Sequence, residues 1–474
     1  MNANLDPLAA LAPDVPAAAA LDRGRLLRKA VPRRSHAGWT PTVERDPVAT
    51  VLASNEGRLQ DLVPIRMGRM ASSPFAFLRG SAAVMAADLA HTPAMGEQVQ
   101  LCGDAHLSNF GLYASPERTL LFDLNDFDET LPGPWEWDVK RLAVSMLIAA
   151  RNSGFAVEVR EGIVLDTVRE YRTRMAQFAA MRNLEVWYTR FEVEKLMPQL
   201  RSQVGGKMRK RLDKVVTKAQ RRDSVHAFTK LSQEVGGERR IVSDPPLVVR
   251  LADFPESDRR DHARADLERL LHEYSLTLQH QRRLLLEQFR LVDLARKVVG
   301  VGSVGTGAWI ALLLGRDGQD PLFLQFKEAQ PSVMEEFAGA SEYCNAGERV
   351  VAGQRIMQAS SDIFLGWLTV EQSVYGGSRD YYVRQLRDWK GSLVVEEMDS
   401  RALSVYGQLC AATLAHAHAR SGDRIAIAGY LGSGDVFERA ILAFSEAYAE
   451  QNDRDYEALA EAVETGRVSA ERSL

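Results

Sequence analysis

Residues 102–110 read Cys-Gly-Asp-Ala-His-Leu-Ser-Asn-Phe, and this stretch decides how the rest of the chain is interpreted. It follows the run 98–102, which predicts a short strand. An aspartate with an asparagine five residues later, here Asp104 and Asn109, is what phosphoryl transfer requires. The aspartate accepts the proton of the attacking hydroxyl, and the amide oxygen helps to hold Mg²⁺. Because such a pair is common by chance, its surroundings must support it.

An acidic cluster follows the next predicted strand, 119–124. Residues 123–129 read Asp-Leu-Asn-Asp-Phe-Asp-Glu, and hard oxygen ligands at this density suit Mg²⁺. Asp123 has the better spacing from the asparagine, whereas Asp126 opens an Asp-Phe pair similar to the Asp-Phe-Gly element of kinases. We therefore expect both Asp123 and Asp126 as candidate metal ligands beside Asn109.

A glycine motif of the form GxGxxG lies much later in the chain, at residues 300–305. It occurs in dinucleotide-binding folds, where a helix begins at the third glycine, and in kinases, where the loop joins two strands. Here the apolar run 309–314 is followed by Asp317-Gly318 and a second apolar run, which predicts a hairpin. The loop is therefore expected to fold over ATP phosphates through Gly300, Gly302, Ser303 and Gly305.

Lys327 ends the third strand of this region and is placed like the kinase lysine that grips the ATP phosphates. Such a lysine needs a carboxylate partner. Glu335, Glu336 and Glu348 on the following helical segment are candidates; Glu348 has the more kinase-like separation, and the sequence does not choose among them. Residues 381–390 are the expected strand and hinge beside adenine, with Gln385 as a contact.

Two of these stretches resemble known enzymes. Residues 103–109 are similar to the GDxHxxN loop of aminoglycoside and choline phosphotransferases, and residues 137–143 to the aspartate-started helix that follows their metal aspartate. Cys102 stands where those enzymes usually have histidine. Over most of residues 24–450 the chain resembles a bacterial family of unknown function that is grouped with the protein-kinase-like superfamily.

The resemblance implies an α+β, bilobal, protein-kinase-like fold with a small β-rich lobe and a large helical lobe. In ordinary kinases the glycine loop precedes the catalytic loop, but here it follows about 190 residues later, which indicates a circular permutation. The alternative is that one motif is accidental. The expected domains are an N-terminal extension that is partly disordered, a helical lobe, a nucleotide-binding lobe and completing C-terminal helices, at 1–60, 61–296, 297–390 and 391–474.

The coarse pattern along the chain predicts where helices and strands lie. Strands are expected at 363–370 and 381–386, and helices at 75–89, 137–150, 348–358, 400–465 and most of 157–295, with a helical pattern running to residue 297. The tail 1–22 is expected to be disordered. The basic run 207–222 is expected to be a solvated helix face. Arg66, Arg69 and Arg79 could bind an anionic substrate, although surface ion pairs are their more common use.

Composition narrows the class of protein. The 474 residues carry 59 Lys+Arg and 63 Asp+Glu, a net charge of −4, so a nucleic-acid-coating protein is not expected. No apolar run approaches the roughly 20 residues that span a bilayer, so no membrane association is expected. The three cysteines, Cys102, Cys344 and Cys410, lie far apart, which argues against a disulfide scaffold and favours the cytoplasm.

The combined expectation is an ATP- and Mg²⁺-dependent phosphotransferase acting on the hydroxyl of an unknown, small-molecule acceptor, with Asp104 and Lys327 as catalytic residues. Two alternatives on the same fold are a nucleotide-binding regulator without transfer activity and an adenylyltransferase. A third, a dinucleotide-dependent enzyme, requires a helix immediately after Gly305. The sequence leaves the oligomeric state open.

Overall fold

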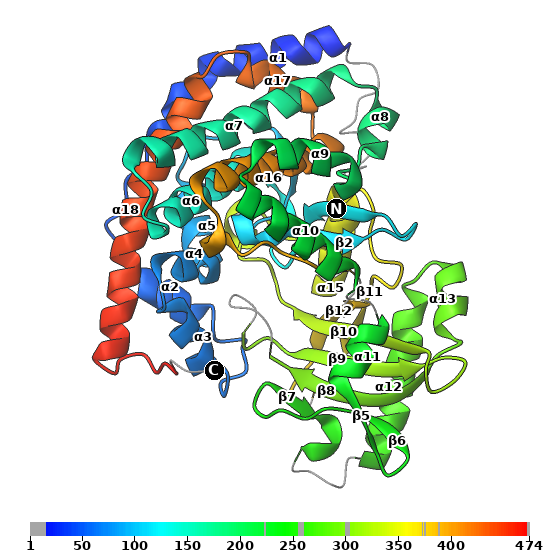
Figure 1. Cartoon of the computed structure of the whole chain (residues 1–474). Coiled ribbons are helices and arrows are strands. Elements are labelled where there is room, and N and C mark those ends of the chain that lie inside the picture. The colour runs from blue at the N-terminus through cyan, green and yellow to red at the C-terminus, as the bar shows by residue number, and fades with distance from the viewer. Residues whose placement is uncertain are drawn as a thin grey trace, which may run out of the picture.

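The computed structural model describes residues 16–221, 224–254, 260–298, 304–371, 373, 376–386 and 389–471. It has a larger helical part and a smaller part built around a β-sheet (Figure 1). The helical part comes from both ends of the chain, and the sheet part from its middle. The prediction of an α+β protein with a small sheet-containing part and a large helical part is therefore confirmed.

Three long helices form the centre of the helical part: α6 (Trp135–Asn152), α7 (Val157–Ala180) and α16 (Ser400–Ser421). The sequence predicted an apolar stripe on α6, but every residue from Trp135 to Ala150 is buried. The buried set includes charged side chains, which need partners inside the protein. Around this centre lie α1 (Ala17–Ala30), α17 (Arg424–Leu431) and α18 (Val436–Glu464).

The N-terminal segments are more ordered than the sequence indicated. Residues 17–22, assigned to a disordered tail, open helix α1, and Gly24 of α1 lies so close to α17 that an added Cβ would stand 2.0 Å from the Ala426 carbonyl oxygen. The helix expected at 75–89 is divided at Ser81 into two helices. The remaining helices of this part are α2 (Pro47–Ala53), α3 (Val63–Met70), α4 (Pro74–Gly80), α5 (Ala82–Ala90), α8 (Asn183–Tyr188), α9 (Val193–Gln203) and α10 (Gly206–Gln220).

Two short antiparallel strand pairs flank the predicted catalytic loop, 102–109, and the acidic cluster, 123–129. β1 (Gln98–Leu101) pairs with β4 (Leu131–Pro134), and β2 (Phe110–Ala114) pairs with β3 (Leu120–Leu124). β1 and β3 confirm the predicted strands, whereas β2 and β4 were not predicted. The end of α16 lies against β1, where the Gln100 backbone N–H donates to Ser421 Oγ at 3.0 Å.

The sheet part contains a six-stranded antiparallel sheet in the order β11-β12-β10-β9-β8-β7. Its strands are β7 (Val248–Arg250), β8 (Arg290–Lys297), β9 (Ala308–Leu314), β10 (Pro321–Ala329), β11 (Gly366–Val370) and β12 (Arg379–Gln385). β9 and β10 form the predicted hairpin, with Ala308 opposite Lys327. A strand follows Gly305 where a dinucleotide fold needs a helix, so that alternative is wrong.

The sheet also begins earlier than the predicted boundary at residue 297. The helical pattern of 258–297 divides into α12 (Arg260–Leu276), α13 (His280–Leu286) and strand β8. Pairing of β8 with the fully buried β9 outweighs the local helical pattern. The other elements of this part are α11 (Ser224–Leu231), β5 (Ser232–Val235), β6 (Glu238–Ile241), α14 (Glu335–Ala338) and α15 (Ala346–Met357).

Candidate functional site

A cavity of about 470 Å³ lies between the helical part and the sheet part. Three predicted site residues, Asp104, Asn109 and Asp126, line it from the helical part. Residues 328–331, at the end of β10, line it from the sheet part. The predicted loop, the acidic cluster and β10, the strand that contains the predicted lysine, therefore meet at one place.

The loop 102–109 is held from below by α6. Asp138 accepts the backbone N–H groups of Cys102, at 2.7 Å, and Gly103, at 3.0 Å. His418 of α16 places Nε2 3.2 Å from Asp138 Oδ2, and its Nδ1 lies 2.8 Å from the Tyr171 hydroxyl. All these groups are buried, so each needs a hydrogen-bond partner inside the protein. Together they form a buried polar network that supports the loop.

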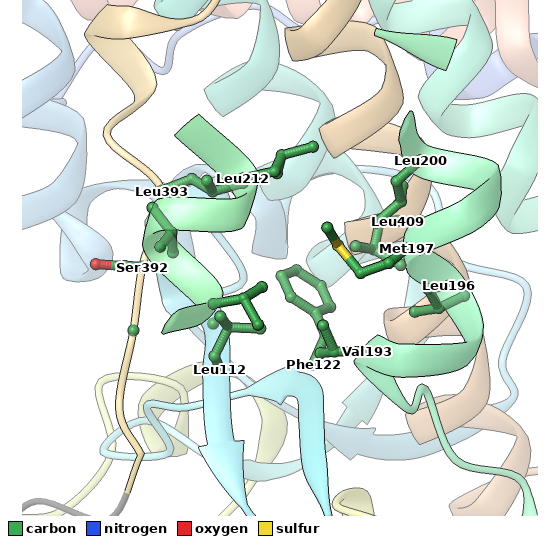
Figure 2. A pocket seen from close by; sticks show the side chains of 14 residues that line it. Leu112, Phe122, Val193, Leu196, Met197, Leu200, Leu212, Ser392, Leu393 and Leu409 are labelled. Carbon is green, nitrogen blue, oxygen red and sulfur yellow. The ribbon is translucent and has the colours of Figure 1, made fainter. Parts of the chain in front are cut away.

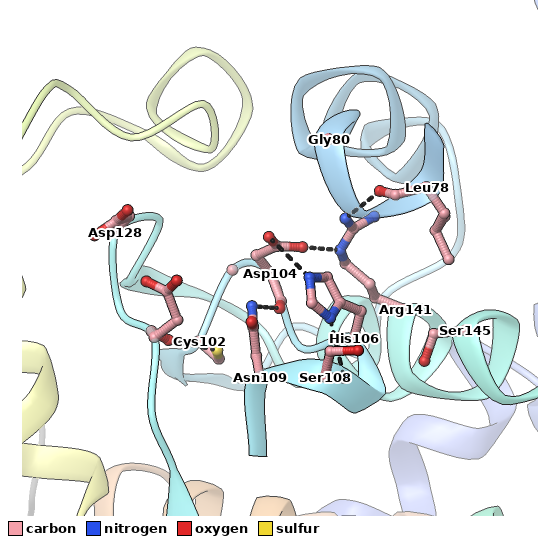
Figure 3. A network of polar contacts seen from close by, with 12 residues as sticks. Leu78, Gly80, Cys102, Asp104, His106, Ser108, Asn109, Asp128, Arg141 and Ser145 are labelled. Carbon is pink, nitrogen blue, oxygen red and sulfur yellow. Dashed lines mark hydrogen bonds and ion pairs between the residues drawn. The ribbon is translucent and has the colours of Figure 1, made fainter. Parts of the chain in front are cut away.

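Asp104 is oriented by two cationic or polar neighbours (Figure 3). Arg141 of α6 donates from Nε to Asp104 Oδ1 at 2.5 Å and from another nitrogen to the Leu78 carbonyl at 2.8 Å. His106 Nε2 lies 3.6 Å from Asp104 Oδ2, while His106 Nδ1 accepts the Ser108 N–H. Burial lowers the pKa of His106 to about 4, so the neutral ring carries its proton on Nε2 and points it at Asp104.

Asn109 and Asp126 leave oxygen atoms available for a cation. The Asn109 amide donates to the Asp104 carbonyl at 2.8 Å, and no described residue donates to the Asn109 carbonyl oxygen. Asp126 Oδ1 is buried and has no hydrogen-bond partner within the described ranges. Burial and then Asp128 raise the pKa of Asp126. The described residues contain no cluster of three or more His, Cys, Asp or Glu for a metal, so a cation here would need further oxygen atoms from a ligand.

Asp123, the other predicted metal ligand, lies elsewhere. It is buried on β3, accepts the Leu124 N–H at 2.9 Å and the Ala359 N–H at 3.4 Å, and does not line the cavity. Burial raises the pKa of Asp123 to about 7. Of the two aspartates that the sequence left open, only Asp126 lies beside Asn109 in the cavity wall.

Lys327 of β10 reaches across to the acidic cluster. Its Nζ forms an ion pair with Asp128 and lies 3.6 Å from Asp126 Oδ1. The Tyr382 hydroxyl of β12 donates to Asp128 Oδ1 at 3.0 Å. Burial alone would lower the pKa of Lys327, but the carboxylates of Asp126 and Asp128 outweigh it and raise that pKa. Burial alone would raise the pKa of Asp128, but the charge of Lys327 outweighs burial and lowers that pKa.

The glutamates predicted to pair with Lys327 have other partners. Glu335 lies 3.8 Å from Arg349 of α15 and accepts the Ser332 N–H at 2.9 Å. Glu348 lies in the first turn of α15, where the Asn345 side chain caps its N–H. The predicted pairing is therefore corrected to Asp128 and Asp126, because α15 presents an arginine and not a glutamate to the acidic loop. That arginine donates to the carbonyls of Asp128 and Thr130 at 2.8 and 2.7 Å.

The predicted nucleotide contacts are only partly described. Gly300, Gly302 and Ser303 lie outside the described residues. Gly305 has φ +89°, and its carbonyl accepts the Leu59 N–H at 2.6 Å. Gln385 donates from its backbone and its side chain to Asp362, at 2.6 and 3.0 Å, and does not line the cavity.

Sequence reasoning missed several residues of the site. Asp128 was seen only as part of the acidic cluster, although its spacing of two from Asp126 could have indicated it. Arg141 lies three residues after Asp138, so both can face the loop from one side of α6. Arg66, for which surface ion pairs were the expected use, has only 2% of its surface exposed and lines the cavity.

A second cavity, of about 40 Å³, contains no charged side chain (Figure 2). It is a packing gap between α9, α10 and the β2–β3 pair, lined by side chains such as Phe122, Met197 and Leu212. α10 turns its apolar side to this gap, and most of its basic residues are exposed, as the sequence predicted. The chemistry of the molecule is therefore expected in the larger, polar cavity.

The described helices include none that is both long and apolar enough to cross a membrane. In comparison with known proteins, residues 58–462 match the model of a family described as "Uncharacterized protein conserved in bacteria (DUF2252)". No curated protein and no solved structure matches the chain. Since the family model covers well over half of the sequence, the chain belongs to the DUF2252 family of bacterial proteins.

Proposed function

We propose that this protein is a phosphotransferase of permuted, kinase-like fold that uses Mg²⁺ and ATP to phosphorylate a hydroxyl group of a small molecule. One observation carries the proposal. Lys327, on the strand that follows the glycine loop and its partner strand, meets Asp126 and Asp128 beside the cavity that also contains Asp104 and Asn109. Kinases need this combination of lysine, metal ligands and catalytic aspartate within one cleft.

The arrangement of the chain supports a permutation. α16 ends against β1, which leads into the loop 102–109, although the two segments are about 320 residues apart in sequence. A chain in which α16 ran directly into β1 would place the sheet part before the catalytic loop, which is the ordinary kinase order. Permutation needs such neighbouring segments so that one connection can replace another.

Each residue has a defined role in the proposed reaction. Arg141 and His106 hold the Asp104 carboxylate toward the acceptor, whose hydroxyl proton passes to Asp104. The acceptor oxygen forms a bond to the γ-phosphorus as the bond from that phosphorus to the β,γ-bridging oxygen breaks, and ADP leaves. Lys327 moves its charge from the two aspartates toward the phosphates when these arrive.

The residues present fit a magnesium ion. Asp126 Oδ1, which is buried and accepts no hydrogen bond from the described residues, and the Asn109 carbonyl oxygen are hard ligands. Mg²⁺ typically takes one or two protein carboxylates together with substrate phosphates. When bound, Mg²⁺ would neutralise phosphate charge during transfer.

The proposal is tested by calorimetric titration of the full chain with Mg·ATP. We expect binding by the wild type and a loss of about tenfold or more in Lys327→Met and Asp126→Asn, because each removes a charge that contacts the phosphates or the metal. Lys210→Met, on the exposed face of α10, is the matched control and should bind like the wild type. Equal affinity in all four proteins would contradict the site.

A second measurement distinguishes the reactions that this fold could perform. Wild type and Asp104→Asn are incubated with Mg·ATP and a panel of small alcohols, and the products are analysed by mass spectrometry. A gain of phosphate that depends on Asp104 is expected. A gain of AMP would indicate adenylyl transfer, and nucleotide binding without any product across the panel would indicate a regulator.

A further inference from the structure

The cavity has a basic wall opposite its acidic one. Asp104, Asp126, Asp128 and Glu129 line it from the strand pairs and Glu328 from β10, whereas Arg58, Arg66 and Arg79 line it from the N-terminal segments between α2 and α5. Three guanidinium groups around one cavity are more than the proposed transfer reaction uses. The hydrogen-bond partners of Arg66 and Arg79 within the protein show which of their N–H groups remain for a ligand.

Arg66 of α3 is a buried cation with neutral partners only. It donates to Asn55 Oδ1 at 2.6 Å and to the Gly80 carbonyl at 2.7 Å, and its Nε has no hydrogen-bond partner among the described residues. Of the carboxylates that the structure describes, none lies at ion-pair distance from the Arg66 guanidinium. Burial and then the charge of Arg58 lower its pKa well below the usual value, and Glu129 opposes them only in part. A buried guanidinium in this position lacks the anion that normally compensates it.

Arg79 lies on α4 and lines the same cavity as Asp104. Its Nε is buried without a hydrogen-bond partner, and no described residue forms an ion pair with it. Its guanidinium carbon stands 5.9 Å from the Phe75 ring centroid, a cation–π contact within α4. Burial lowers the pKa of Arg79, and the Asp104 carboxylate, which opposes that lowering, is already paired with Arg141. Arg79 can therefore offer its donors to a ligand beside Asp104.

The first turn of α5 adds backbone donors to this wall. Ser81, Ala82 and Ala83 line the cavity at the point where α5 begins. The Ser81 hydroxyl does not cap the helix, because it donates back to the Leu78 carbonyl at 3.3 Å. An uncapped helix start beside two guanidinium groups provides N–H donors and a partial positive charge, which together suit an oxyanion.

We propose that the acceptor is an anionic small molecule, whose phosphate or carboxylate group is bound by Arg79, Arg66 and the first turn of α5 while its hydroxyl faces Asp104. This inference rests on the proposed phosphotransferase function and deepens it. It separates this protein from the aminoglycoside and choline phosphotransferases that its catalytic loop resembles, because aminoglycosides and choline are cations and this wall would repel them.

Binding of inorganic phosphate tests the wall directly. The full chain is saturated with Mg²⁺ and a non-hydrolysable ATP analogue, so that the nucleotide site is filled, and is titrated with phosphate or with choline in a calorimeter. We expect phosphate to bind, choline to show no heat, and Arg79→Met to weaken phosphate binding by about tenfold or more. Arg69→Met, on α3 but outside the cavity lining, is the matched control and should bind phosphate like the wild type.

Arg79 is the principal variant because Arg66 is buried and its loss could unfold the chain. Equal phosphate affinity in the wild type and Arg79→Met would overturn the proposal, and so would preferential binding of choline. If Arg79→Met weakens the ATP analogue as much as phosphate, the arginine serves the nucleotide and the acceptor assignment falls.

Two further arms separate this inference from the proposed function. Phosphate is titrated again without nucleotide: binding that depends on Arg79 in a chain that does not bind ATP would refute the proposed function and support the anion site. Acceptor screening then compares hydroxy acids and sugar phosphates with amino alcohols at equal concentration. Transfer to the amino alcohols alone would support the proposed function and refute the anionic acceptor.

Discussion

The two sides of the cavity are held in different ways. The loop 102–109 is fixed inside the helical part by Asp138, Arg141 and His418, which are buried and belong to α6 and α16. Lys327 and Tyr382 belong to the sheet part and contact the acidic loop at Asp126 and Asp128. The loop 102–109 is thus fixed within the core of the helical part, whereas the contacts of Lys327 and Tyr382 depend on how the sheet part packs against the helical part. Substitutions on the first side should cost stability, and those on the second should cost less.

The largest effect is expected for Asp138→Ala. It leaves the N–H groups of Cys102 and Gly103 buried without acceptors and removes a partner of His418, so the free energy of unfolding should fall by about 3–5 kcal/mol. Urea denaturation measures the loss. Asp435→Ala, at an exposed ion pair with Arg439, is the control and should unfold at nearly the same urea concentration as the wild type, because exposed ion pairs contribute little to stability. Similar losses in the two variants would refute the idea of a buried support.

Gly103→Ala tests the shape of the same loop. Gly103 has φ +80°, and an added Cβ would lie 2.2 Å from the Glu129 carbonyl oxygen, so we expect a loss of about 3 kcal/mol from strain and overlap together. Gly154→Ala is the control, because Gly154 has φ +70° with no atom within 4 Å of the added carbon. It should cost about 1 kcal/mol from the backbone alone. The difference between the variants, from urea curves, measures the close approach of the two loops.

A third prediction concerns pH. The pKa of His106 falls from 6.5 to about 4 on folding, so between these values the unfolded chain binds a proton that the folded chain does not. Stability therefore decreases as pH falls through this window, by about 2 kcal/mol at pH 5 for this residue. His106→Gln should remove that share of the slope of unfolding free energy against pH. His91→Gln, at an exposed position, is the control for replacing a histidine by glutamine. If His106→Gln and the wild type have the same slope, the burial of a neutral His106 ring is refuted.

The smallest effect is expected on the side of the sheet. Tyr382→Phe removes the hydroxyl that donates to Asp128 and should lower the free energy of unfolding by about 1–2 kcal/mol. The more specific expectation is faster hydrogen exchange in residues 126–129, without faster exchange in 102–109. Equal exchange in both segments would mean that the two sides open together, and the contrast between them would be lost.

The sequence predicted best where spacing along the chain determines the contact. Asp104 and Asn109 are joined through one short loop, and the hairpin before Lys327 is set by Asp317-Gly318, so local pattern was sufficient. The partner of Lys327 was not predicted, because it depends on how the sheet part meets a loop about 200 residues away. No periodicity within α15 shows that Arg349, rather than Glu348, faces that loop.

The sequence pattern also could not predict where the sheet part begins or that Arg66 is buried. β8 becomes a strand because β9 offers it a buried neighbour, and Arg66 becomes buried because α3 and α4 close around it. Both outcomes follow from tertiary packing, which can outweigh local preference. The kinase-like fold, the nucleotide and the metal remain predictions that the experiments above address.

The support of the loop 102–109 has a consequence for biosynthesis. Asp138 and its partner His418 are 280 residues apart, and the whole sheet part lies between them in the sequence. A ribosome makes the loop before any strand of the six-stranded sheet but makes α16 only after every one of those strands has been completed. The nascent helical part therefore exposes the apolar surface that α16 will cover, and the loop acquires its full support only after α16 has been made. Chaperone dependence during translation is the property that this chain order predicts.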